Sequence, residues 1–315
     1  MSILGIHHVT AMCGDAQKNV DFYAGILGLR LVKATVNYDD PDTWHLYYGD
    51  GLGRPGSLIT FFPWPGHPGV AGNGQVGVTA FSIPKGSMGA WIDRLTTKGI
   101  PFFGPEERFN DHVLSFGDPD DMPLELVESS VDDLRTDSWQ ALPAEMAIRG
   151  FHSATLFSAR PEATVQMLRD IMGFTVLDEE DERARLIVGE GRPHQMVDVV
   201  LRHGGQNGKT GAGTVHHIAW RVADDIEQSR WQEAVTKVGA QVTPVQDRTY
   251  FHSIYFREPG GILYEIATDG PGWTVDEPLD ALGHTLALPS WLEERRGPIM
   301  MRLPQLVAPD GVDLP

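Results

Sequence analysis

The sequence has a single cysteine, few basic residues and no long apolar run, and each shortage excludes a class of protein. Cys13 alone allows neither an intrachain disulfide nor a thiolate metal cluster, which is typical of the reducing cytoplasm. Lysine and arginine number 25 against 43 acidic residues, and the net charge of −18 repels nucleic-acid phosphates and anionic lipids. No apolar run reaches the length of about 18 residues that a membrane helix needs, and the opening MSILGIHHVT has no secretion signal. We expect a cytoplasmic protein that binds neither nucleic acid nor membranes.

The remaining composition is that of a folded protein. Hydrophobic residues make up 41% of the chain and charged residues 22%, which excludes a disordered or fibrous protein. A length of 315 residues favours two domains or an internally repeated architecture. The 35 glycines and 22 prolines predict many tight turns, and hence a fold rich in strands.

A repeat of four modules organises most of the chain. Each module consists of a strand, a helical stretch that ends at a glycine, and a cluster of strands. The first strands of the modules are GIHHVTAM, VGVTAFSI, FHSATLFS and VHHIAWRV, and the helix-ending glycines are Gly28, Gly99, Gly173 and Gly239. From Gly99 to Glu125 is 26 residues, and from Gly239 to Glu265 is again 26 residues. These two glutamates therefore occupy equivalent places on the last strands of modules two and four.

Four such βαβββ modules predict an α+β fold in which strands curl into two cupped sheets with helices outside. The expected N-terminal domain, residues 1–135, holds modules one and two. A polar linker over 136–149 leads to a C-terminal domain, 150–270, with modules three and four. Residues 271–315 lack the repeat, and we expect this tail to pack on the domains.

Candidate metal ligands lie on the first and last strands of the modules. Strict alternation along VHHIAWRV places His216 on the apolar face and directs His217 into the cup, and it separates His7 from His8 in the same way. In ILYEIAT, Glu265 points away from its apolar neighbours. A carboxylate in such a strand is costly to bury unless it is paired or binds a metal.

Two imidazoles and a carboxylate without a thiolate form the ligand set of a facial-triad site, which suits Fe(II) and oxygen chemistry and could also take Mn(II). Two sets are compatible with the repeat: His8, His217 and Glu265, or His152, His217 and Glu265. The spacing does not decide between them. Modules one and two together offer only His8 and Glu125, which are too few.

Two further residues bear on chemistry near the carboxylate. If residues 259–261 form a three-residue hairpin loop, Tyr255 pairs directly with Glu265. Arg248 lies on the preceding segment and could bind an anionic oxygen. The alternatives are an ordinary cross-strand aromatic and a surface salt bridge. His45 and the other histidines outside the pattern are interpreted as structural.

Several segments resemble the vicinal oxygen chelate superfamily, and within it the ring-cleaving dioxygenases that open para-hydroquinones such as chlorohydroquinone and methylhydroquinone. The resemblance covers about residues 3 to 300 and is carried by GIHHVT, WHLYYGD, RGFHSAT, VHHIAW and DRTYFHSIYFREPGGILYEIAT. It implies that the metal ligands are His8, His217 and Glu265, which leaves His152 as a structural echo. It also implies that Tyr255 and Arg248 lie near the substrate, and that His7 and His216 support the ligands, although alternation places those two on the far face.

The function implied by the resemblance is Fe(II)-dependent opening of a small aromatic diol by O2. A glyoxalase-like isomerase or lyase is one alternative, for which Glu125 is the only candidate second carboxylate. A metal-free small-molecule binding protein is another, but such a protein has no need of a complete His-His-Glu set. The sequence is also compatible with a homo-oligomer.

Overall fold

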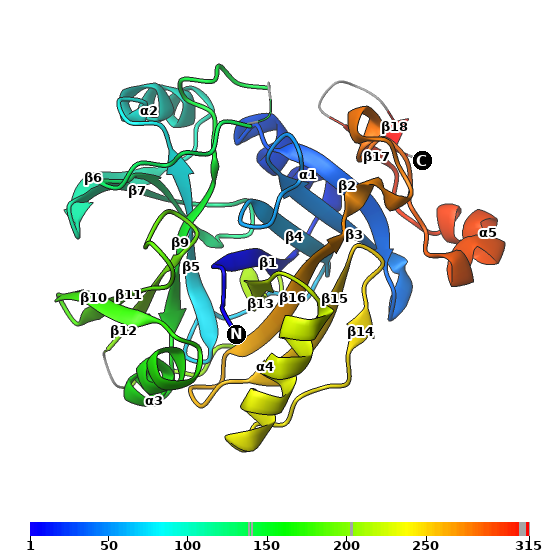
Figure 1. Ribbon diagram of the computed structural model, residues 1–315. Helices are drawn as coiled ribbons and strands as arrows, with labels where there is room; N and C mark the ends of the chain where they lie inside the picture. Colours follow the sequence, from blue (N-terminus) through cyan, green and yellow to red (C-terminus); the bar gives the residue numbers. More distant parts are fainter. Residues whose placement is uncertain (138, 140, 202–203, 309–312, 315) are drawn as a thin grey trace.

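A computed structural model describes residues 1–315 apart from 138, 140, 202–203, 309–312 and 315. Its architecture is two curled eight-stranded sheets with helices on their outer sides (Figure 1). This is the α+β fold of cupped sheets that the four-module repeat predicts.

The first sheet has the order β14-β15-β16-β13-β1-β4-β3-β2, and the second has the order β10-β11-β12-β9-β5-β8-β7-β6. The strands of the first sheet are β1 (Ile6–Cys13), β2 (Arg30–Asn37), β3 (Asp40–Gly49), β4 (Leu58–Pro63), β13 (Thr214–Val222), β14 (Gln246–Asp247), β15 (Phe251–Arg257) and β16 (Leu263–Pro271). Those of the second are β5 (Gln75–Ile83), β6 (Phe102–Arg108), β7 (Asp111–Gly117), β8 (Pro123–Glu128), β9 (Gly150–Phe157), β10 (Thr175–Glu180), β11 (Arg183–Ile187) and β12 (Met196–Val200).

Each module contributes one helical segment, and each segment ends two residues before its predicted glycine. The segments are α1 (Ala16–Val20) continued by the π-helical η1 (Asp21–Ile26), α2 (Met88–Thr97), α3 (Pro161–Gln166) continued by η2 (Met167–Ile171), and α4 (Asp225–Lys237). Asp224 caps α4 by accepting a hydrogen bond from the Glu227 amide, and Trp231 and Val235 are buried on one face of this helix. Gly99 and Gly239 adopt φ values of 69° and 90°, the left-handed conformation that favours glycine after a helix.

Each sheet joins a module from the first half of the chain to a module from the second half. Antiparallel pairing of β1 with β13 joins module one to module four, and pairing of β5 with β9 joins module two to module three. The expected division into 1–135 and 150–270 groups modules one and two together, whereas each of these segments supplies one half of both cups. This arrangement arises because the first strand of each module pairs with the first strand of a module from the other half of the chain.

The tail packs on the first sheet, beside β2 and β3 (Figure 1). It contains η3 (Trp273–Val275), η4 (Leu279–Ala281), η5 (Ser290–Arg295), α5 (Arg296–Met300), β17 (Leu306–Val307) and β18 (Asp313–Leu314). Leu286 forms a bridge with Ala34 of β2, and the Trp44 indole of β3 donates a 2.9 Å hydrogen bond to the Pro304 carbonyl.

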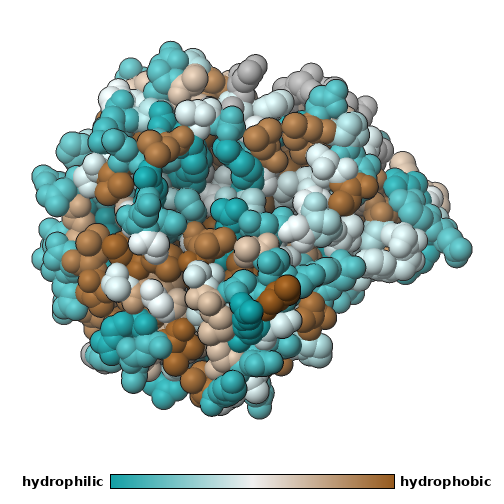
Figure 2. Space-filling model, in the orientation of Figure 1, coloured by the Kyte–Doolittle hydropathy of each residue, from teal (hydrophilic) through white to brown (hydrophobic). Residues whose placement is uncertain are grey.

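The face shown in Figure 2 is largely hydrophilic, with apolar side chains in separate groups between polar ones. Within the described residues, no helix combines the length and the apolar character needed to cross a bilayer.

Candidate metal centre

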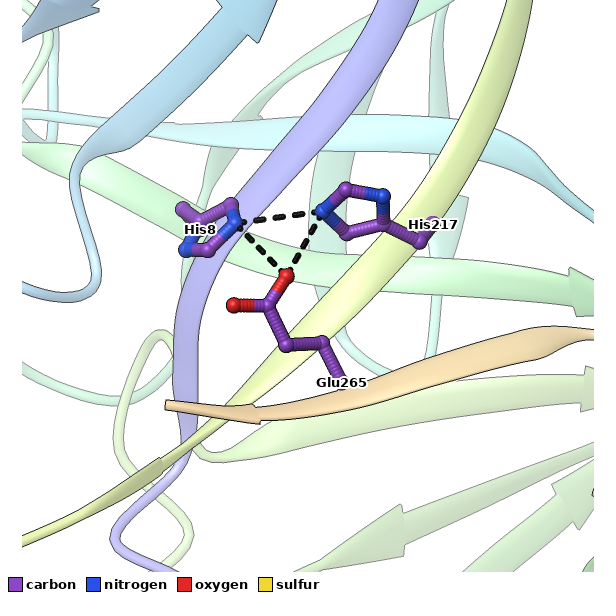
Figure 3. Close-up of side chains that lie close together, drawn as sticks. All are labelled: His8, His217 and Glu265. Carbon is purple, nitrogen blue, oxygen red and sulfur yellow. Dashed lines mark hydrogen bonds and ion pairs between the residues drawn. The ribbon is translucent and has the colours of Figure 1, made fainter. Parts of the chain in front are cut away.

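Three neighbouring strands bring His8, His217 and Glu265 together. Ala219 of β13 pairs with His8 of β1 on one side and with Glu265 of β16 on the other. His217 lies two residues before Ala219 and therefore projects from the same face of the sheet. The small Ala219 side chain leaves space between the three polar groups, which point toward one another (Figure 3).

The three candidate ligand atoms converge in a buried space. The Oε2 atom of Glu265 lies 2.8 Å from Nε2 of His217 and 3.3 Å from Nε2 of His8, and the two nitrogens are 3.3 Å apart. The exposed fractions of the residues are 2% for His8, 6% for His217 and 0% for Glu265. Divalent ions such as Zn²⁺ take nitrogen and oxygen ligands at about 2.0–2.2 Å, so these atoms can contact one ion from one side.

The state of Glu265 fits a cation at this position. Burial alone would raise its pKa, but positive charge beside the carboxyl group, here that of the His8 and His217 rings when protonated, lowers the pKa well below the ordinary value. The Ser253 hydroxyl donates to Oε1, whereas Oε2 is buried without a hydrogen-bond partner among the described residues. An ionised, buried and unpartnered oxygen between two imidazole nitrogens is a donor that a metal ion satisfies.

His7 fixes the tautomer of His8. The Nε2 atom of His7 lies 3.1 Å from the carbonyl oxygen of Thr268, which can only accept, so Nε2 carries the proton. Burial lowers the pKa of His7 well below its ordinary value and keeps the ring neutral. Its Nδ1 atom then accepts from Nδ1–H of His8 at 2.9 Å. This leaves Nε2 of His8 with a free lone pair directed at the site.

The second histidine pair repeats this arrangement. Nδ1 of His216 lies 2.7 Å from Nδ1 of His217. When Nδ1 of His217 donates this hydrogen bond, its Nε2 presents a lone pair toward Glu265. Burial lowers the pKa of His217, which favours the neutral ring that a metal ligand requires.

The expectation that His7 and His216 lie on the far face is wrong. The β1–β13 register skips His7 on one strand and His216 on the other. A β-bulge sets two consecutive residues against one partner and so interrupts the alternation of side chains between the faces. Each bulged histidine consequently contacts the histidine that follows it.

A cavity of about 550 Å³ adjoins the two candidate histidine ligands. It is lined by His8 and His217, and also by Arg248, Phe251 and Tyr255. This volume lies within the range of about 300–1,000 Å³ that is typical of small-molecule sites.

Tyr255 lies beside the candidate ligands, as the hairpin argument predicts, and Arg248 lies next to Tyr255. Tyr255 pairs with Glu265 across β15 and β16, and its ring centre is 5.6 Å from that of His217. The Arg248 guanidinium donates from Nε to the Tyr255 hydroxyl at 3.2 Å. Burial and the charge of Glu265 raise the pKa of Tyr255, so its hydroxyl keeps its proton at neutral pH.

The structure does not assemble the alternative set with His152. This histidine lies on β9 of the second sheet, where its Nε2 is 3.3 Å from the Ser129 hydroxyl. Glu125, also in the second sheet, accepts two 3.0 Å hydrogen bonds from Arg108. Glu125 lies on β8 of the second sheet, whereas the candidate metal ligands lie on β1, β13 and β16 of the first.

Sequence reasoning missed His45, which lines the cavity. Its ring lies 4.1 Å from the ring of Tyr47 and 4.0 Å from that of Phe62, measured between centres. The signal was present, because alternation along WHLYYGD places the apolar Trp44 on one face of the strand and His45 with Tyr47 on the other.

Comparison with known proteins gives consistent matches over most of the chain. A family model described as "Glyoxalase/Bleomycin resistance protein/Dioxygenase superfamily" matches residues 5–126 and 150–266. A Bacillus subtilis (strain 168) protein named "Putative ring-cleaving dioxygenase MhqO" is 47% identical over 294 residues, which cover 93% of each chain. The "Chlorohydroquinone/hydroquinone 1,2-dioxygenase" of Sphingobium indicum is 34% identical over 298 residues, which cover 92% of each chain.

Solved structures agree with these matches. A crystal structure of a Bacillus subtilis protein is 46% identical and superposes with a TM-score of 0.93 over 98% of both chains. Glyoxalase I from Zea mays is 13% identical and superposes with a TM-score of 0.61 over 84% of this chain and 92% of that chain. At that identity the second likeness concerns the fold alone.

Proposed function

Because the chain belongs to the glyoxalase/bleomycin resistance protein/dioxygenase superfamily, we propose that it is a metal-dependent dioxygenase that opens the ring of a para-hydroquinone with O2. The observation that carries this proposal is the convergence of two imidazoles and one carboxylate beside a cavity of about 550 Å³ that the two imidazoles line. Three protein ligands on one side leave positions open for the diol and oxygen. Fe(II) is the metal we propose, and Mn(II) suits the same donors.

The relatives support the substrate class. The Sphingobium indicum protein is named for chlorohydroquinone and hydroquinone, and the first Bacillus subtilis relative is named for ring cleavage. The low identity to glyoxalase I leaves an isomerase without comparable support. Moreover Glu125, the candidate second carboxylate of an isomerase, is paired with Arg108 in the other sheet.

The metal, when bound, would supply Lewis acidity and a meeting point for the diol and O2. His8, His217 and Glu265 would hold it, and His7 and His216 would keep both imidazoles in the ligating tautomer. These five residues orient the site before the substrate arrives, which lowers the reorganisation that the reaction needs.

Tyr255 and Arg248 would act on the ring oxygen of the substrate nearest the metal. The Tyr255 hydroxyl keeps its proton at neutral pH, because burial raises its pKa, and can donate it as a hydrogen bond to that oxygen. The Arg248 guanidinium holds the Tyr255 hydroxyl and stabilises negative charge on the same oxygen. Phe251 packs 5.1 Å from the ring centre of His8 and limits the access of water to it.

Oxygen uptake tests this function. Protein purified without oxygen and loaded with Fe(II) is given methylhydroquinone, chlorohydroquinone and catechol in turn. We expect uptake equal to the amount of hydroquinone consumed, together with a new semialdehyde absorbance. Turnover without oxygen, or no uptake by metal-loaded protein, would contradict the proposal.

A further inference from the structure

A chain of hydrogen bonds crosses the inner face of the first sheet. The Tyr47 hydroxyl lies 2.9 Å from Nδ1 of His45, and Nε2 of His45 lies 2.9 Å from the Thr60 hydroxyl. The Thr60 hydroxyl in turn lies 2.9 Å from the Thr10 hydroxyl. Thr10 and Thr60 are fully buried and Tyr47 is 4% exposed. Mutual hydrogen bonds hold these buried polar groups in place beside the cavity, where their remaining hydrogen-bonding capacity can serve a ligand.

The chain runs across the sheet, away from the strand that carries His217. Thr10 pairs with His217 across β1 and β13, Thr60 pairs with Thr10, and Tyr47 pairs with Thr60. Neighbouring strands are about 4.8 Å apart, so Tyr47 is three strand spacings from His217 along the curled sheet. Thr10, His45 and Tyr47 all line the cavity that His8 and His217 adjoin. The Tyr47 end of the chain is therefore the end remote from the metal.

The Tyr47 hydroxyl can make one more hydrogen bond whether it donates to His45 or accepts from it. A neutral imidazole has one donor and one acceptor nitrogen, and a hydroxyl has one donor and two acceptor positions. If Tyr47 donates to His45, its oxygen can still accept from a ligand hydroxyl. If His45 donates to Tyr47, the Tyr47 hydroxyl can donate to the ligand instead. Burial lowers the pKa of His45 and raises that of Tyr47, which is consistent with both groups being neutral.

We propose that Tyr47, oriented by His45, binds the hydroxyl of the substrate that lies para to the metal-bound oxygen and so selects para-diols over ortho-diols. A para-diol carries its second hydroxyl on the opposite side of the ring, where Tyr47 lies. An ortho-diol keeps both oxygens at the metal end and leaves Tyr47 without a partner. A site built to hydrogen-bond a substrate hydroxyl discriminates against analogues that lack it. This inference rests on the proposed function and adds the basis of its substrate preference.

Binding without oxygen tests the subsite separately from catalysis. Metal-loaded protein is titrated with hydroquinone and with 4-methylphenol, in which a methyl group replaces the second hydroxyl. The fluorescence of Trp64, which lines the cavity, reports binding. We expect Tyr47→Phe to bind hydroquinone about tenfold more weakly, in line with the loss of one hydrogen bond, and to bind 4-methylphenol as wild type does. We expect His45→Leu to shift the hydroquinone affinity in the same direction, because it removes the partner that orients Tyr47.

Tyr48→Phe is the matched control. Tyr48 is the next residue on the same strand, is fully buried on the other face, and does not line the cavity. This variant should change neither affinity. Equal weakening of both ligands by Tyr47→Phe, or no change in hydroquinone binding, would overturn the subsite. Oxygen uptake by the wild type with hydroquinone is measured in parallel. If the wild type takes up oxygen but Tyr47→Phe binds hydroquinone with unchanged affinity, the subsite alone is overturned. If the wild type takes up no oxygen, the proposed function is overturned.

Discussion

Glu265 and Glu125 occupy equivalent positions on the last strands of modules four and two, and their neighbours decide what each can do. Glu265 faces the Nε2 atoms of two imidazoles, which are candidate donors to a metal. Glu125 instead meets the Arg108 guanidinium, whose Nη1 atom donates to both oxygens of its carboxylate at 3.0 Å. An arginine supplies both positive charge and N–H donors to a buried carboxylate. Imidazole lone pairs supply neither, so a cation is needed between them and the carboxylate. The same residue type is therefore a candidate ligand in one cup and a structural ion pair in the other.

Replacing each glutamate separates these roles. We expect Glu265→Gln to weaken metal binding by more than about a hundredfold, because losing a ligand should exceed the 10–100-fold effect of losing a supporting partner. Elemental analysis of protein dialysed against a weak chelator measures the bound metal.

Glu125→Gln should retain the metal and lose stability instead. Removal of the carboxylate leaves the partly buried Arg108 with a weaker partner, at a cost of about 1–3 kcal/mol in the free energy of unfolding. Urea unfolding measures this cost. Equal loss of metal in both variants would contradict the assignment of the ligands.

At the scale of elements, the turn between β7 and β8 joins module two to module one through Asp118. This carboxyl group accepts from the amides of Asp120 and Met122 and from the Tyr23 hydroxyl of η1 at 3.1 Å. Burial raises the pKa of Asp118 to about 6, above its ordinary value of 3.8. The folded protein therefore holds this proton more tightly than the unfolded chain does.

The sign of the resulting pH dependence follows from linkage. Because the folded state binds the extra proton between pH 3.8 and about 6, the contribution of Asp118 to stability falls as pH rises through this window. Asp118→Asn cannot ionise, so its unfolding free energy relative to wild type should rise by of order 3 kcal/mol between pH 4 and 7. Urea unfolding at a series of pH values measures the difference. A difference that stays constant with pH would show that Asp118 is not perturbed.

The sequence predicts elements correctly where local rules for helix ends and hairpins apply. Its predictions fail where the pairing of distant strands changes the local geometry. The glycine-terminated helices and the Tyr255–Glu265 register follow from capping and hairpin rules, and the structure has both. Alternation fails at His7 and His216 because bulges arise from the pairing of β1 with β13, which is not visible in either strand alone. Alternation alone places His45 beside Tyr47, but the contact of His45 with Thr60 of β4 depends on strand pairing that the sequence does not display.

At the scale of the whole molecule, the tail closes one side of the first cup. Trp273 packs against Tyr47 and Tyr250, with ring centres 5.0 and 4.7 Å apart. Lys33 of β2 is fully buried, and its ammonium group lies 2.5 Å from Glu277 and 2.6 Å from Asp276 of the tail. The sequence could not predict this contact, nor the joining of module one to module four, because both depend on pairs separated by more than 200 residues.

Lys33→Met tests the attachment of the tail. The substitution leaves the Glu277 carboxylate buried without its cation, which should cost about 3–5 kcal/mol. We expect chymotrypsin to cut the variant near Trp273 or Leu282, two buried sites that native packing protects.

Adding Glu277→Gln to Lys33→Met provides the control. The neutral amide removes the stranded charge and can still accept from the Thr285 hydroxyl. The double variant should regain part of the lost stability and resist the protease longer than the single variant. Proteolysis of all three proteins at the wild-type rate would show that this contact does not hold the tail.

The most direct test of the proposed dioxygenase activity is the mass of the product formed from methylhydroquinone under isotopically labelled O2. We predict a ring-opened product with the composition of the substrate plus one whole O2 molecule, with label in its carboxylate. A product of unchanged mass, or one whose added oxygen comes from water, would contradict ring cleavage by a dioxygenase.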